Sequence, residues 1–484
     1  MLTIGIGATV ITRTATNNSE LFTRLIIGVL IYSTILSQQS FNNSIQEIPI
    51  LGGLFHTNNL INGIEMYIYI ISILLILFLI GRKDLVAEYR LVLGFSILGA
   101  ITLIESYDIY STFLAIELQS LSLYVIATIT RKEATAAGLK YFLLGSLSSA
   151  IFLLGLVIIY SLTGVTQYDG FNILYALPSN ELGIIISGET ESYNKLCNVG
   201  ITFIAIGLLF KIGAAPFHSW APDVYDNVPT IITSWLAIMG KISILSFIFV
   251  FSTTGVFAES LESFSLLTIS ATLSLLIGSI LGLVQYKIKR LLAYSSISHL
   301  GFLLIGLSID SGLAASSFLF YMFQYWLSLI SIFAILIYYE SGNSSIRSVS
   351  NLGFLKFNPA LIFALIISLF SLTGIPPLIG FFGKQMILYT SLLNGYYFIS
   401  TVAICTSVIS AAYYLRIVKT IGFVGVDNGG DGTEFSISTI KESNISNKSL
   451  SWIISIISLM TLSVFQTPSL LLNLAQHFVL NNLF

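Results

Sequence analysis

The chain has 484 residues, of which 55% are hydrophobic and only 9% are charged, and its formal net charge is −2. Soluble domains are about a quarter charged because charge covers the surface that faces water, so most of this chain's surface is expected to face lipid. The near-neutral balance argues against a nucleic-acid partner and against a strongly charged substrate funnel.

Apolar segments long enough to cross a bilayer recur along the whole chain. A spanning helix needs about 20 apolar residues, with a range of roughly 17–25. The fold class predicted is an all-α polytopic membrane protein of about fourteen transmembrane helices. The predicted helices are 1–12 (short), 20–38, 63–81, 89–105, 108–129, 136–163, 197–219, 228–252, 262–285, 290–308, 313–338, 360–390, 393–422 and 450–475.

The first segment, MLTIGIGATVIT, is apolar but has no basic n-region, and no Arg- and Ser-rich amphipathic presequence is present. We therefore expect insertion from the side on which the chain is made, as in bacteria or for an organelle-encoded protein. Cys197 and Cys405 form no CxxC motif or cluster-binding run and are interpreted as small apolar fillers.

The loop charges support this division into helices, because basic residues concentrate on one side of a membrane. The opposite side carries Lys195 alone, among ten acidic residues, so both termini are predicted on the outer, charge-poor side. The basic residues of the inner loops and helix ends are Arg13, Arg24, Arg82, Lys83, Arg90, Arg131, Lys132, Lys287, Lys289, Arg290, Arg347, Lys356, Arg416, Lys419, Lys441 and Lys448.

Five charged residues remain inside the predicted apolar segments: Lys140, Lys211, Lys241, Lys384 and one acid, Glu117. A charge at the bilayer centre costs about 2.5–3.5 kcal/mol even on the lenient scales, so these side chains must face protein or water. The cations outnumber the anion. Burial disfavours a charged ammonium group and a nearby carboxylate favours it, so such lysines can switch between protonated and neutral forms.

This imbalance favours a proton relay over a set of static ion pairs, which would need similar numbers of each sign. Lys140 lies near the inner end of its segment and could instead extend to the interface. His299, in SISHLGF, is a further relay candidate, although a lone histidine on an apolar helix is often a satisfied core residue. His218, in APFHSWAPD, is a weaker candidate for an inner channel mouth.

Two long apolar segments are interrupted by glycine and proline, at Pro216 in one and at Pro376 and Pro377 in the other. Proline removes a backbone hydrogen bond, and the freed groups are tolerated only inside protein or beside water. Because a lysine accompanies each break, we predict two inverted five-helix repeats rather than incidental kinks. The expected division is 1–88, 89–252 (first repeat), 262–422 (second repeat) and 423–484 (inner loop and last helix).

Several strings resemble the antiporter-like subunits of respiratory complex I, the proton-pumping NADH:ubiquinone oxidoreductase. The resemblance covers roughly residues 90–420. Within the family, ELQSLSLYV, the chain length and a lysine rather than a glutamate at position 384 favour the subunit nearest the quinone-binding end. The strings are AIELQSLSLYVIA (115–127), KYFLLGSLSSA (140–150), GLLFKIGAAPFHSWAPDVYDNVPT (207–230), KIKRLLAYSSISHLGF (287–302) and GIPPLIGFFGK (374–384).

The resemblance implies a role for each matching residue. Glu117 and Lys211 correspond to the family's ion pair, Lys241 to its connecting lysine and Lys384 to the lysine of the outward half, with His299 between the last two. Quinone reduction elsewhere in the complex would alter the Glu117–Lys211 pair and so drive the proton onward.

The resemblance also implies the surroundings of the chain. NADH, FMN, iron–sulfur clusters and ubiquinone would belong to the parent complex. No nucleotide-binding glycine motif or cluster ligand set occurs in this chain, so no redox centre is expected in it. The expected partners are other membrane-arm subunits, including neighbouring antiporter-like subunits, and membrane lipids.

Three alternatives remain open at this point. The chain could be an Mrp-type Na⁺/H⁺ antiporter subunit, a subunit of a related membrane-bound hydrogenase or plastid dehydrogenase, or a structural scaffold. The preference for Ile, Asn, Ser and Tyr over Ala and Val favours the mitochondrial inner membrane over a bacterial plasma membrane.

Overall fold

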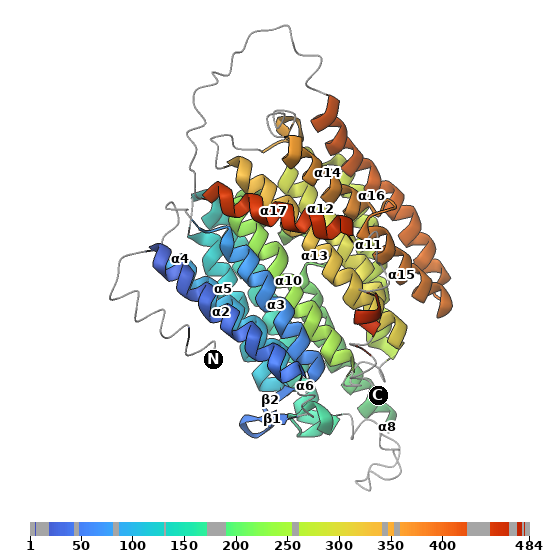
Figure 1. Ribbon diagram of the computed structural model, residues 1–484. Helices are drawn as coiled ribbons and strands as arrows, with labels where there is room; N and C mark the ends of the chain where they lie inside the picture. Colours follow the sequence, from blue (N-terminus) through green and yellow to red (C-terminus); the bar gives the residue numbers. More distant parts are fainter. Residues whose placement is uncertain are drawn as a thin grey trace.

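The computed structural model is almost entirely helical (Figure 1). The residues that it describes are 5, 19–42, 48–80, 87–129, 132–171, 190–253, 261–340, 347–352, 359–423, 446–463, 472–476 and 479. The helices are α2 (Ser19–Asn42), α3 (Asn59–Leu77), α4 (Ala87–Glu105), α5 (Ile109–Thr128), α6 (Lys132–Thr163), α8 (Thr190–Ile212), α9 (Trp220–Asn227), α10 (Thr230–Thr253), α11 (Leu261–Val284), α12 (Ile288–Leu307), α13 (Gly312–Glu340), α14 (Pro359–Thr373), α15 (Ile379–Leu393), α16 (Tyr397–Phe423) and α17 (Ser446–Ser463).

Three helices form the centre of the bundle. In the most apolar stretch of α10 every residue is buried, and in those of α12 and α13 nearly every residue is buried. In the corresponding stretches of α2 and α6 only 33% of the residues are buried. The exposed side chains of the outer helices are apolar, for example Leu143 and Leu147 in α6 and Phe398 in α16. Apolar side chains can face lipid directly, whereas a charged group in lipid is costly. Charged groups therefore lie in the centre of the bundle or at its two ends.

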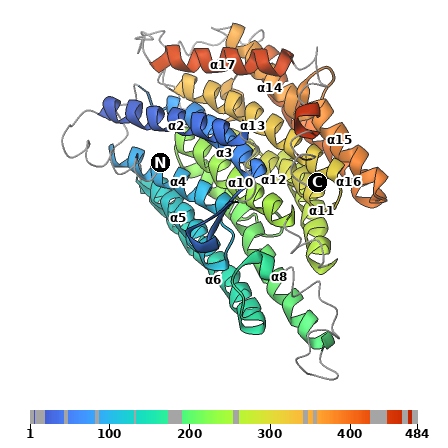
Figure 2. The same ribbon diagram turned by 60° about the horizontal axis from the view of Figure 1, so that its bottom comes forward.

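Ten of the described helices are long and apolar enough to cross a membrane, and Pro359–Thr373 and Leu450–Ser463 are shorter apolar helices. The predicted all-helical membrane fold is therefore confirmed. The expected span 1–12 lies, apart from Gly5, outside the described residues. In both views α17 runs across the neighbouring helices (Figures 1 and 2), packed on α3, α13 and α14. The count of fourteen spans and the two repeats stay predictions.

A capped helix start and a short hairpin close one end of the bundle. Asp108 caps α5: its Oδ2 accepts a hydrogen bond from Tyr110 N at 3.2 Å, and its own N–H donates to Ser111 Oγ at 3.3 Å. Strand β1 (Ile48–Ile50) pairs antiparallel with β2 (Phe55–Thr57). Phe55 also forms a bridge with Ser106, which places the hairpin against the end of α4. These contacts position the start of α5, the helix that carries Glu117.

Both predicted interruptions are real breaks between two helices. α8 ends at Ile212 and α14 ends at Thr373, and each is followed by a glycine with positive φ, 75° at Gly213 and 82° at Gly374. The next two N–H groups after each helix turn back to one carbonyl, that of Leu209 or of Phe370. A left-handed residue after the last turn is a common helix end, and glycine adopts it without a Cβ clash.

The structure corrects the count of buried charges. Glu117 was expected to be the one acid inside the apolar segments, but Glu65 lies in α3 with 6% of its surface exposed. Arg90, expected at an inner helix end, is inside α4 and only 2% exposed. Glu65 adds one negative group and Arg90 adds one positive group, so these two residues leave the excess of buried cations unchanged. Glu65 is not recognisable as buried from the sequence because it lies near the start of a helix.

Candidate functional site: a row of buried lysines

Lys211 and Glu117 face each other between α8 and α5. Lys211 Nζ lies 3.6 Å from Glu117 Oε1, and the exposed fractions of the two side chains are 7% and 24%. This separation is longer than a hydrogen bond, and Glu117 Oε1 has no hydrogen-bond partner. Lys211 Nζ instead donates to the hydroxyl of Tyr124 at 3.3 Å. The pair is thus a loose one, in which a small movement can strengthen or break the ion pair.

Lys241 occupies the centre of the bundle on α10, with 1% of its surface exposed. Its Nζ donates to Ser296 Oγ on α12 at 2.7 Å and lies 5.6 Å from the ring centroid of Tyr225. Across the described ranges, no carboxylate forms an ion pair with it. A fully charged ammonium group without an anion is costly in such a place, so this position favours a lysine that can release its proton.

His299 lies one turn beyond Ser296 on the same face of α12, because residues three apart are neighbours on a helix. It is buried, and both ring nitrogens contact tyrosine hydroxyls: Nδ1 lies 2.6 Å from Tyr321 Oη and Nε2 lies 3.1 Å from Tyr414 Oη. Its ring stacks on that of Tyr325, with centroids 4.8 Å apart. An imidazole bonded at both nitrogens can take a proton on one side and release one on the other.

Lys384 lies in the second turn of α15, directly after the second helix break. Its Nζ donates to the carbonyl oxygen of Thr373, the last residue of α14, at 2.8 Å. An added Cβ at Gly374 would lie 2.9 Å from Lys384 Cδ, and one at Gly380 only 1.7 Å from the carbonyl oxygen of Ser371. The glycines therefore let the two half-helices approach, and the broken helix end supplies a carbonyl to the buried ammonium group.

The structure thus places Lys211, Lys241, His299 and Lys384 in the protein interior. It also adds contacting residues that the sequence did not single out. Ser296 joins Lys241 to the helix of His299, and Lys384 interacts electrostatically with His299. The tyrosines around His299 come from α13 and α16, far apart in sequence. In the sequence, only the helical spacing of Tyr321 and Tyr325 points to a shared face. The same spacing is equally typical of an ordinary apolar core.

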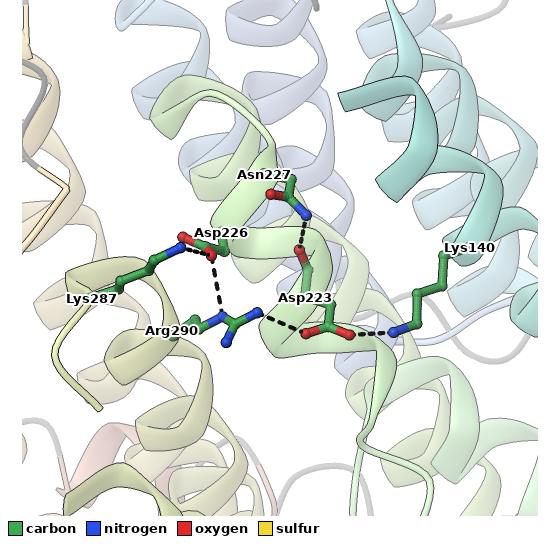
Figure 3. Close-up of polar contacts among 6 residues, drawn as sticks. All are labelled: Lys140, Asp223, Asp226, Asn227, Lys287 and Arg290. Carbon is green, nitrogen blue, oxygen red and sulfur yellow. Dashed lines mark hydrogen bonds and ion pairs between the residues drawn. The ribbon is translucent and has the colours of Figure 1, made fainter. Parts of the chain in front are cut away.

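Lys140 does not belong to this buried group. Its side chain is 46% exposed and forms an ion pair with Asp223 on α9 (Figure 3). Arg290 Nη2 lies 3.1 Å from Asp223 Oδ1, and Arg290 Nε lies 3.2 Å from Asp226 Oδ2. Lys287 Nζ lies 2.6 Å from the same Asp226 oxygen. This basic cluster of Lys140, Lys287 and Arg290 clamps α9, the half-helix after the first break, between α6 and α12.

We expect Asp223→Asn to lower the thermal stability of the purified protein only slightly. The change removes the charge that faces both Lys140 and Arg290, and exposed ion pairs contribute about 0–1 kcal/mol each. The loss should shrink in high salt, which screens surface charges. Thermal unfolding of Asp223→Asn and unchanged protein at low and high salt measures both effects. A large loss that salt leaves unchanged would show that the cluster acts as a buried network.

The remaining expected positions flank the first and second breaks. His218 lies between α8 and α9, half-buried, with its ring centroid 6.5 Å from that of Tyr294, and its Nδ1 has no hydrogen-bond partner. Pro216 lies in the same link, and Pro376 and Pro377 lie between α14 and α15. Trp220 Nε1 donates to the carbonyl oxygen of Phe210 at 3.1 Å, which satisfies one group freed by the first break. His218 stays a prediction as a channel residue.

No group of three or more His, Cys, Asp or Glu side chains that could hold a metal ion occurs in the described part of the chain. The buried groups are amines, an imidazole, hydroxyls and carboxyls, which exchange protons and carry no electrons. The site can therefore move protons by changes of charge and hydrogen bonding.

The family model and two relatives that match this chain are named after NADH:quinone oxidoreductases or Mrp antiporters. The family described as NADH:quinone oxidoreductase/Mrp antiporter, TM matches residues 106–410. NADH-ubiquinone oxidoreductase chain 2 of Rhizopus oryzae is 45% identical over 436 residues, which are 83% of this chain and 81% of that protein. NADH-quinone oxidoreductase subunit N of Pelagibacter ubique is 34% identical and covers 84% of each chain.

Solved structures share the fold. A chain of respiratory complex I from Thermus thermophilus with bound aureothin matches with a TM-score of 0.76 and 23% identity, over 98% of this chain and 97% of that chain. A chain of the Mrp complex from Dietzia sp. matches with a TM-score of 0.82 and 16% identity, over 100% of this chain and 96% of that chain. At these identities the likeness concerns the fold alone.

Proposed function

Since the chain belongs to the NADH:quinone oxidoreductase/Mrp antiporter family, we propose that it is a proton-translocating subunit of the membrane arm of an NADH:quinone oxidoreductase. Within the family it groups with NADH-ubiquinone oxidoreductase chain 2 and bacterial subunit N. The observation that carries this function is the series of ionisable side chains inside the bundle: Glu117 on α5 and Lys211 on α8, then Lys241 on α10, His299 on α12 and Lys384 on α15.

The proposed transfer is electrostatic at each step. When the Lys211 ammonium group is close to Glu117, its positive charge is stabilised and repels a proton on Lys241. When the pair opens, Lys211 releases its proton more readily, and Lys241 can accept one. Ser296 donates or accepts at the next position, and His299 with its two tyrosine hydroxyls carries the proton toward Lys384. Each protonation biases the neighbouring group because charges interact strongly in a medium of low dielectric constant.

The energy source lies outside this chain. In the proposed complex, NADH oxidation and quinone reduction belong to other subunits, which would hold FMN, iron–sulfur clusters and ubiquinone; this follows from the likeness to NADH-ubiquinone oxidoreductase chain 2. The other membrane-arm subunits and lipid cover the apolar outer helices. Relatives from a fungus, plants and bacteria support the mitochondrial inner membrane or the bacterial plasma membrane as the location, and the composition of this chain favours the former.

The proposal is tested with the intact membrane complex in proteoliposomes. NADH oxidation with a soluble quinone should acidify the side that we predict to be outer, and antibodies to this chain should isolate the NADH-oxidising subunits with it. Proton movement that requires Na⁺ but neither NADH nor quinone would contradict the proposal and support the Mrp-type antiporter. The identity of 45% to a chain 2 protein favours the oxidoreductase subunit over that alternative.

A further inference from the structure

A second group of buried ionisable side chains lies on α3 and α4, which carry none of the lysines of the row. Glu65 is 6% exposed and lies in the second turn of α3. Glu105 is the last residue of α4 and is partly buried. The two carboxyl groups are within hydrogen-bonding reach of each other. We call Glu65 and Glu105 the acid pair.

The acid pair continues into a polar stripe along α3. Asn62, Glu65, Tyr69 and Ser72 are spaced three, four and three residues apart, so they share one face of the helix. All four are buried. In an apolar spanning helix, polar residues face the protein interior and mark pathways for ions or protons. The stripe therefore extends from the acid pair into the bundle.

Several buried polar atoms around the acid pair have no hydrogen-bond partner among the described residues. Glu65 Oε1 and Asn62 Nδ2 are buried atoms without a hydrogen-bond partner. His56 Nδ1 in β2 is a third, and the His56 ring stacks on Tyr107 with centroids 4.3 Å apart. β2 lies beside the end of α4 because Phe55 forms a bridge with Ser106. Unsatisfied buried groups cost about 1–3 kcal/mol each, so a change of protonation that gives Glu65 a hydrogen-bond partner would be favourable here.

The acid pair is at the opposite end of the bundle from the basic cluster. Gln167, just beyond the end of α6, forms a bridge with Asp108, close to the end of α4. Lys140 lies near the other end of α6, a helix of 32 residues, or about 48 Å at 1.5 Å per residue. Because basic residues mark the inner side, the acid pair lies toward the outer side.

We propose that Glu65 and Glu105 share one exchangeable proton and form an outer-side proton site separate from the lysine row. Two carboxylates at hydrogen-bonding distance in a medium of low dielectric constant cannot both be charged, and one proton between them removes the repulsion. Two carboxyl groups suit a proton better than a metal ion, since the described residues hold no third acid, histidine or cysteine in one group with them. This inference does not depend on the proposed function.

The test is infrared difference spectroscopy of the intact complex, which detects the C=O stretch of a protonated carboxylic acid. At neutral pH the unchanged complex should show such a band, and Glu65→Gln and Glu105→Gln should each lose it. Glutamine has the shape of the protonated acid, so assembly should be retained. Glu88→Gln is the matched control, because Glu88 is an exposed acid on the same helix as Glu105. The control should keep the band.

A band that persists in both single variants would overturn the proposal, as would a band that Na⁺ removes at constant pH, since that result would identify a cation site. A second measurement needs no variant. A hydrophobic carbodiimide reacts with protonated carboxyl groups, and mass spectrometry of the unchanged complex should find the label at Glu65 or Glu105 and not at Glu88. Absence of label from both members of the pair at neutral pH would equally contradict the shared proton.

Discussion

Replacement of Lys211 by methionine is expected to lower proton pumping by the assembled complex on the order of tenfold or more, because coupling between sites is typically about 1–3 kcal/mol. The change removes the only described cation within 4.0 Å of Glu117. Glu117 then has no described cation within ion-pair distance whose charge it can stabilise. Pumping is measured in proteoliposomes as acidification per NADH oxidised.

Two further variants separate a relay from a structural ion pair. Removing one partner of a buried pair can cost about 3–5 kcal/mol, so Lys211→Met could also reduce assembly. Lys211→Arg keeps the positive charge but holds its proton permanently; it should therefore restore assembly without restoring pumping. Lys195→Met is the matched control, an exposed lysine on the same helix, α8, and it should pump normally. Full pumping by Lys211→Arg would rule out proton transfer through Lys211.

Lys241→Met should lower pumping as Lys211→Met does, but without a loss of stability. Lys241 is 1% exposed, and its ammonium group has one described hydrogen-bond partner, Ser296 Oγ. Methionine fills a similar volume without a charge to bury, and replacement of buried charges by apolar groups is often neutral or stabilising by about 1–4 kcal/mol. The change also removes the proposed relay group between Lys211 and His299, so we expect pumping to fall by about tenfold or more.

The two effects are measured on the same preparation. Thermal unfolding of the purified complex reports the stability, and acidification per NADH oxidised reports the pumping. A scaffold subunit would predict unchanged pumping whenever the complex assembles. Normal pumping by a fully assembled Lys241→Met complex would therefore support the scaffold alternative, and a strongly destabilised variant would show that the Lys241–Ser296 contact is mainly structural.

Hydrophobicity predicted the helices well because lipid imposes a simple rule on sequence. A spanning segment must be apolar over about 20 residues, and its backbone must bond internally. The segment 228–252 corresponds to α10 (Thr230–Thr253) and 313–338 to α13 (Gly312–Glu340). The two breaks were also predictable, because glycine and proline act locally on the backbone. Within the last predicted segment, 450–475, α17 covers the residues up to Ser463 and residues 472–475 are also helical; residues 464–471 lie outside the described part of the chain.

The partners of the buried charges could not be predicted in the same way. Lys140 and Lys384 each lie in an apolar segment, yet one is at the surface beside Asp223 and the other is bonded to the carbonyl of Thr373. Glu65 was missed because it lies near a helix start, where a charge usually reaches the interface. Its burial results from its closeness to Glu105 and from the hairpin packed against the end of α4.

The order of residues was thus sufficient to identify a multispanning membrane protein, its two interrupted helices and a set of lysines that lipid cannot accept. Only the packing of α10, α12, α13 and α16 showed that Lys241 bonds to Ser296 on the helix of His299, and that tyrosines from two helices far apart in sequence contact the histidine. The physical reason is the range of the forces. Solvation by lipid acts on each segment independently, whereas charges and hydrogen bonds depend on distances of a few ångströms between helices that the chain brings together only when folded.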